Sequence, residues 1–176
     1  MLIRVELRNL AIKALKQANT LAEDRIFSPM DWPTTPAMYP VILVKTPRER
    51  KVSENRSIPK FTTTAELHLS LRIEGNSEAE ATDTLEALCE QVENAILTDY
   101  NLVREVQQFS YVDTHVEVNS DQRKHFGEAV LQIGMEFYEV FDPQLYSPHA
   151  PIAGPLEGVN IQYEIDSKEI KQSIDL

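Results

Sequence analysis

Residues 61–73 alternate between mostly apolar and polar side chains with a period of two. The odd positions carry Phe, Thr, Ala, Leu, Leu, Leu and Ile, whereas the even positions carry Thr, Thr, Glu, His, Ser and Arg. Because successive side chains of a β-strand point to opposite faces, this pattern predicts a long strand with one buried and one solvated face. Antiparallel sheets tolerate a solvated face and all-parallel sheets do not, so the pattern argues against a doubly wound nucleotide-binding fold.

Two segments show the three- and four-residue spacing of apolar residues that is typical of an amphipathic helix. The first is predicted to span residues 2–23. The second begins at Ser77, which is followed three residues later by Glu80, the spacing of a capping box. Its apolar stripe consists of Ala81, Leu85, Leu88, Val92 and Ile96, with Cys89 beside it. We expect both helices to pack on one face of the sheet.

Three more segments have the composition of strands: residues 41–44, 110–118 and 129–137. The polar residues 119–128 lie between the last two, which predicts a hairpin with a long tip. The predicted element order is therefore α-β-β-α-β-β. It describes an α+β fold in which a mostly antiparallel four-stranded sheet carries two helices on one face.

Prolines divide the chain. Residues 27–40 contain four of them, which predicts an extended connector that Trp32 and Tyr39 pin to the core. A chain of 176 residues is long enough for one sizeable core, so we predict one domain over residues 1–141. Residues 142–176 are expected to form an extended, Pro-rich C-terminal arm. Its apolar residues alternate with polar ones from Val159 to Ile165, which allows it to add an edge strand to its own subunit or to the next one.

The charge balance restricts the partners that the chain can have. Its formal net charge of -11 disfavours nucleic-acid binding by the molecule as a whole, because such binding depends on clustered Lys and Arg. Cys89 is the single cysteine, so an intrachain disulfide is excluded and cytoplasmic production is expected. Charged residues interrupt the apolar amino-terminal segment, which predicts neither a signal peptide nor a membrane span.

The sequence offers no catalytic, cofactor-binding or metal-binding motif. Its five glycines do not form a phosphate-binding loop, and its four histidines lack the spacing of a zinc site. His68 and His115 lie in predicted strands, where they are expected to be solvated. We therefore expect no catalytic residue, no cofactor and no metal, and we interpret the chain as an assembly component rather than an enzyme. The alternative is a small-molecule binding module for a nucleotide or a sugar, with a pocket between sheet and helices.

One segment departs from the acidic background, the predicted loop KTPRERKVSENRSIPK at residues 45–60. Its basic residues outnumber its acidic ones, and we take them as candidate interface or lumen residues: Lys45, Arg48, Arg50, Lys51, Arg56 and Lys60. Two interpretations stand equal: a solvated hairpin tip, or an electrostatic contact with nucleic acid or with an acidic neighbour. No Lys or Arg occurs between Ile73 and Arg104, so the outer face of the second helix is strongly acidic. A basic loop on one copy and an acidic helix on the next would make a head-to-tail contact that closes into a ring.

A resemblance covers residues 1 to about 140 as an ordered pattern. It consists of the opening helix, RIFSPMDWP in the connector, YPVILVKTP, a polar loop, and IPKFTTTAELHLSLRIEG before an acidic helix. Together these segments resemble the tail terminator proteins, or minor tail protein U-like proteins, of long-tailed bacteriophages and prophages. The arm beyond residue 142 departs from that pattern.

The resemblance implies a structural virion-assembly role without an active site. Proteins of this family form a ring, commonly of six copies, that caps the tail tube, stops its polymerisation and joins it to the head. The implied partners are other copies of the chain, the tail tube protein, the head-tail connector protein and DNA in passage through the ring. The implied location is the host cytoplasm during assembly and then the virion tail.

Overall fold

The computed structural model describes residues 2–28, 35–54, 58–121, 124–142, 158–165 and 168–175, the last two ranges by their backbone. The chain divides into two compact units, Met1–Val140 and Phe141–Leu176. The first unit has an α+β fold. Its elements are α1 (Ile3–Gln17), β1 (Ile26–Phe27), the 3-10 helix η1 (Pro36–Met38), β2 (Val41–Ser53), β3 (Lys60–Gly75), α2 (Glu78–Thr98), α3 (Tyr100–Val103), β4 (Gln108–Asp121) and β5 (Lys124–Val140).

The sheet of the first unit is mixed and has five strands in the order β1-β2-β3-β5-β4. The strands from β2 to β4 pair antiparallel, as the alternating pattern predicts, whereas β1 pairs parallel to β2. The prediction of four strands is therefore wrong by one. A strand of two residues leaves no periodic signal, although Ile26 is buried and pairs with Ile42.

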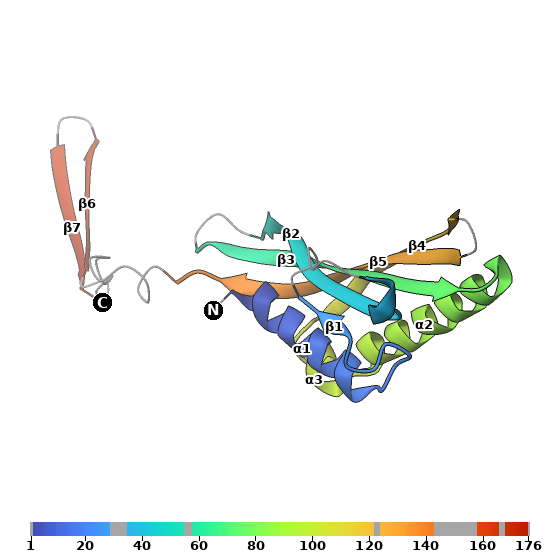
Figure 1. The fold of residues 1–176 in the computed structure, drawn as a ribbon. Coiled ribbons are helices and arrows are strands. Elements are labelled where there is room, and N and C mark those ends of the chain that lie inside the picture. Colours follow the sequence, from blue (N-terminus) through green and yellow to red (C-terminus); the bar gives the residue numbers. More distant parts are fainter. Residues whose placement is uncertain are drawn as a thin grey trace. The chain divides into compact units, whose positions relative to one another are not determined.

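Both long helices lie on the same face of the sheet, as predicted (Figure 1). α1 contacts β2, and α2 lies across β3 and β5. The core between these layers is built from fully buried side chains of both, among them Leu69, Leu131 and Leu85. We call the opposite face of β2, β3, β5 and β4 the open face.

Local chemistry determines where α1 ends and where α2 begins. α1 ends at Gln17, so the prediction that it continues to residue 23 is wrong. Asn19 takes a φ of 48°, a left-handed conformation that asparagine tolerates and that stops a helix. The predicted start of α2 is confirmed, because the Ser77 hydroxyl accepts a hydrogen bond from the Glu80 amide at 3.2 Å. The Glu80 carboxylate in turn accepts one from the Asn76 amide at 3.0 Å, so two amides at the end of the helix are satisfied.

Both hairpins are longer than the sequence predicts. β2 continues through Ser53, so most of the predicted basic loop is strand. β4 continues to Asp121 and β5 begins at Lys124, so the predicted long tip over residues 119–128 is also wrong. Polar residues in these stretches occupy both faces of the strand ends, which removes the alternation typical of a strand, so sequence reasoning interprets the stretches as loops.

The open face is partly covered at one end. The ring of Tyr39 meets the ring of Phe126 edge to face, with centroids 6.3 Å apart. Phe126 lies on β5, two strands away from β2, so the chain that leads into β2 crosses the open face here. Tyr39 therefore contacts the open face of the sheet and not the core between sheet and helices, where the sequence analysis places it, and Trp32 lies outside the described residues.

The second unit contains a hairpin of β6 (Gly158–Ile165) and β7 (Lys168–Asp175). The predicted alternating segment is β6, and it pairs with β7.

Candidate functional site

A β-bulge places three of the candidate basic residues on the open face. Lys45 pairs with His68 and Arg48 pairs with Glu66, so two residues of β2 oppose one of β3 between these pairs. The bulge contains Pro47, which has no amide hydrogen to contribute to a ladder. Without the extra residue Lys45 and Arg48 would lie on opposite faces, because their spacing is odd. With it, Lys45, Arg48 and Arg50 share the open face.

The other candidate residues lie in different surroundings. Lys51 lies on the helix face, where its ammonium pairs with Glu139 and, at 3.6 Å, with Glu49. Lys60 pairs with Glu54 at 2.9 Å and lies over the ring of Tyr138, 5.3 Å from the centroid. Arg56 lies outside the described residues. The six candidates therefore do not form one basic surface.

Arg48 and Arg50 line a hollow of about 350 Å³ on the open face, which we call the arginine hollow. Its other lining residues are Thr64, Glu66, Ser110 and Tyr111. Both arginines are exposed, and neither has an ion-pair partner among the residues that the structure describes. Two guanidinium groups beside hydroxyl groups make a surface suited to carboxylates or other oxyanions.

A second bulge positions the aromatic wall of the arginine hollow. The register of β4 against β5 shifts between Phe109 and Tyr111, which leaves Ser110 as the extra residue. The ring of Tyr111 then lies over Gly134, where an added Cβ would come within 2.5 Å of Tyr111 Cε1. The Tyr111 hydroxyl donates to Glu66 Oε2 at 3.2 Å. Burial, followed by the charge of Glu66, raises the pKa of Tyr111, so the phenol stays protonated at neutral pH.

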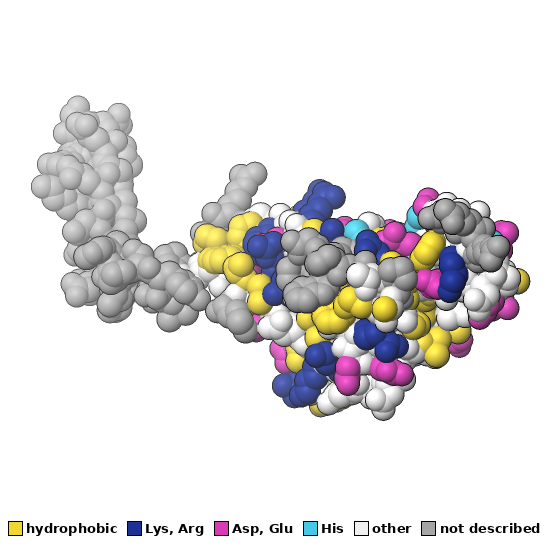
Figure 2. Space-filling view, viewed as in Figure 1, with side chains coloured by type: hydrophobic (Ala, Val, Ile, Leu, Met, Phe, Trp, Pro, Cys, Tyr) yellow, Lys and Arg dark blue, Asp and Glu magenta, His cyan; other side chains and the backbone are white. Residues whose placement is uncertain are grey.

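Exposed apolar side chains occupy the end of the open face next to the arginine hollow. Val52 and Tyr138 both lie opposite Thr62, and Val140 follows two residues after Tyr138. Each of these three side chains is more than half exposed, at 53%, 53% and 56%. Figure 2 shows hydrophobic side chains gathered at this end of the sheet, beside Lys and Arg. We call Val52, Tyr138 and Val140 the end patch.

Helix α2 packs on the opposite face of the sheet and carries acidic side chains, opposite in charge to the arginine hollow. Asp83, Glu86 and Glu90 are exposed on its outer face. The last turn of α2 contains no basic residue to offset the helix dipole. Neither Glu86 nor Glu90 has a hydrogen-bond or ion-pair partner within the described residues.

His68 gives the open face a pH dependence. Burial, with the charge of Lys45, lowers the pKa of His68 below its ordinary value of 6.5. The unfolded chain therefore binds this proton more readily, so its contribution to stability is present above pH 6.5 and is lost as the pH falls through the lowered pKa. The other predicted strand histidine, His115, is exposed on β4, and β5 separates it from the strand of His68.

We expect the thermal midpoint of the wild-type protein to fall between pH 7.5 and pH 6, and His68→Gln to reduce that fall, because glutamine takes up no proton. Thermal unfolding followed by circular dichroism across this interval checks the expectation. The difference between the two proteins should be constant above pH 7.5. Parallel curves down to pH 6 would contradict the assignment to His68.

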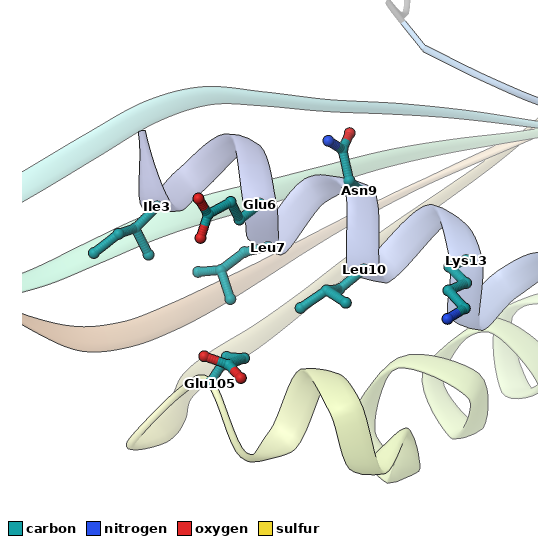
Figure 3. Close-up of a pocket in the computed structure, with 7 residues that line it drawn as sticks. All are labelled: Ile3, Glu6, Leu7, Asn9, Leu10, Lys13 and Glu105. Atoms are coloured by element: carbon teal, nitrogen blue, oxygen red, sulfur yellow. The ribbon is translucent and has the colours of Figure 1, made fainter. Parts of the chain in front are cut away.

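A separate groove of about 430 Å³ runs along α1. It is lined by Ile3, Glu6, Leu7, Asn9, Leu10, Lys13 and Glu105. In Figure 3 the side chains of Leu7 and Leu10 point from α1 toward Glu105, whereas Asn9 points away. Two carboxylates against one ammonium disfavour a phosphate group, so the groove does not suit a nucleotide.

The part of the chain that the structure describes contains few other groups that could take part in chemistry. Burial raises the pKa of the Cys89 thiol to about 11, which keeps it protonated and unreactive. The described residues hold no cluster of three or more His, Cys, Asp or Glu able to bind a metal ion. Across the same residues, every helix is too short or too polar to cross a membrane. No model of a protein family matches the chain, and a search of curated proteins finds no match either.

Sequence reasoning identifies Arg48 and Arg50 but not the residues that surround them. Tyr111 and Ser110 reach the arginine hollow through the pairing of β4 with β5 and of β5 with β3. A bulge leaves no distinct signal in a single sequence, so neither residue stands out. Tyr138 could have been noted, because an aromatic residue at the polar-face position of an alternating strand suggests a contact surface.

Proposed function

We propose that this protein is a structural assembly component of the tail terminator type, a ring-forming protein that caps a tail tube and joins it to a head. In this proposal it carries out no catalysis. Its partners are further copies of itself, a tail tube protein and a head-tail connector protein, with DNA passing through the ring, and it acts in the host cytoplasm and then in the virion tail. The proposal is supported by the surface of the first unit and by the ordered resemblance in the sequence.

The observation that carries the proposal is the open face. The end patch lies beside two arginines without ion-pair partners in the described residues, on a sheet whose opposite face carries the core. Contiguous exposed apolar patches mark interaction sites, and interfaces are enriched in aromatic residues and arginine.

Light scattering coupled to size-exclusion chromatography tests the proposal. We expect the full chain to elute as an assembly whose mass is a fixed multiple of the chain mass over a tenfold range of concentration. Double substitution Val52→Ser with Tyr138→Ser should weaken the assembly, while the fold, monitored by circular dichroism, is retained. A monomer at every concentration would contradict the proposal.

A second candidate function, a small-molecule binding module, is favoured by the groove along α1. Its volume of about 430 Å³ falls in the range of ligand pockets, and its lining is partly apolar. Its carboxylates favour a sugar or a cationic ligand over a nucleotide. A thermal-shift screen tests this function, because a ligand that binds the native state raises the midpoint.

A further inference from the structure

We propose that the arginine hollow of one copy binds the outer face of α2 of a neighbouring copy, with Arg48 and Arg50 paired to Glu86 and Glu90. This inference rests on the proposed assembly function and specifies its principal contact.

The charges are complementary, and none of them forms an ion pair within the described residues of one copy. Arg48 and Arg50 have no ion-pair partner among the described residues, and the same holds for Glu86 and Glu90. Glu86 and Glu90 are separated by four positions on a helix, so they repel each other. No Lys or Arg occurs in the sequence between Ile73 and Arg104 to relieve that repulsion. Cations from another chain would do so.

The spacings also match. Arg48 and Arg50 are two residues apart on one face of a strand, which separates them by about 6.7 Å along the strand. Glu86 and Glu90 are four residues apart on a helix, which separates them by about 6 Å along the axis. A helix that lies parallel to β2 can therefore present one carboxylate to each guanidinium. Thr64 in the hollow offers a further hydroxyl donor.

The geometry favours a head-to-tail contact. The arginine hollow lies on the open face and α2 packs against the other face of the same sheet. One copy cannot satisfy both surfaces by itself, so each copy offers one surface to each of two neighbours. Contacts of this heterologous kind close into a ring when the rotation between copies allows it.

Surrounding charges favour a protein partner over nucleic acid. Glu66 lines the arginine hollow, and the register places Asp113 and Glu136 on the open face close by. These carboxylates confine the positive charge of the open face to the neighbourhood of the two arginines, which matches two carboxylates on a helix better than a continuous row of phosphates. Glu66 itself accepts the hydrogen bond from Tyr111, which holds it beside the aromatic wall.

A charge-swap experiment tests the contact. R48E/R50E and E86K/E90K should each weaken assembly by about 100-fold, because each places like charges across the interface. An equimolar mixture of the two variants should restore assembly at a one-to-one ratio, since acidic hollows then meet basic helices and basic hollows meet acidic helices. The quadruple variant, which exchanges both charges in one chain, should assemble alone. Sedimentation velocity at 50 mM and 500 mM salt gives the readout.

The control is K13E/K16E, which makes the same change of net charge as R48E/R50E on exposed positions of α1 and should leave assembly unchanged. Circular dichroism confirms that each variant is folded. If wild-type assembles and the two double variants assemble equally well, the inference is overturned while the proposed function stands. If wild-type does not assemble, both are overturned. If R48E/R50E abolishes salt-dependent binding of a 30-base-pair duplex without affecting assembly, the surface serves DNA and the inference is again overturned.

Discussion

Replacing Leu85 by alanine is expected to lower the free energy of unfolding by about 3 kcal/mol, because the side chain is fully buried and a cavity would remain. Leu85 lies on α2 at the point where that helix meets Gly127 of β5. A Cβ added at Gly127 would come 3.1 Å from Leu85 Cδ2 and 3.0 Å from Ile73 Cγ1. Gly127→Ala alone should therefore cost about 1 kcal/mol through overpacking.

The pair of substitutions gives a sharper test than either one. In the Leu85→Ala background the methyl group of Gly127→Ala enters the vacated space. There Gly127→Ala should leave the free energy of unfolding unchanged or raise it. We expect a coupling energy of at least about 1 kcal/mol from the four urea-denaturation curves. Strictly additive effects would show that α2 does not lie against β5 at this position.

The second large effect is expected at Glu139, whose side chain lies on the helix face near the end of β5. Its carboxylate pairs with the ammonium of Lys51 and accepts a hydrogen bond from the Thr63 hydroxyl at 2.6 Å. Thr63 is fully buried, and the side chain of Glu139 is 11% exposed. Glu139→Leu leaves the hydroxyl and the ammonium without this partner and should cost about 2 kcal/mol.

Removing the charges of both Lys51 and Glu139 distinguishes two contributions to the free energy of unfolding. One is the cost of leaving the ammonium without Glu139, and the other is the stabilisation that the ion pair itself provides. The double variant K51M/E139L should regain at least half of the stability that Glu139→Leu loses, because no ammonium is then left near an apolar side chain. Glu139→Gln should be milder, since the amide oxygen still accepts from Thr63. Guanidinium denaturation at low protein concentration measures all three. Equal stability of wild-type and Glu139→Leu would contradict the role of this cluster.

Sequence reasoning recovers the elements in which one face is apolar and the other polar. The alternation of residues 61–73 predicts β3 because helices cover one side of this strand along its length. The stripe from Ala81 to Ile96 predicts α2, and Ser77 with Glu80 predicts its first turn. In these elements local pattern and tertiary burial agree.

The same reasoning fails where polar side chains occupy both faces of a strand. In β2 beyond Lys45, Arg48 and Arg50 lie on the open face, while Glu49 and Lys51 lie in the polar cluster around Glu139. The bulge also shifts the phase of the alternation, so the period of two disappears. The segment therefore resembles a loop in sequence although it is a strand.

The arginine hollow depends on pairing across the sheet and is therefore beyond a single-sequence prediction. Arg48 on β2 and Tyr111 on β4 approach it from strands at opposite sides of β3 and β5. Charge alone identified the arginines. Their separation from Lys51, which pairs on the helix face, became evident only from the register.

Amide hydrogen exchange at two protein concentrations tests the central claim, that the open face is a contact surface for other copies. Above the concentration of self-association, we expect slower exchange in residues 45–53 of β2 and in residues 83–90 of α2, with no change along the groove of α1. Exchange that does not depend on concentration in either segment, or protection confined to residues 3–13, would contradict it.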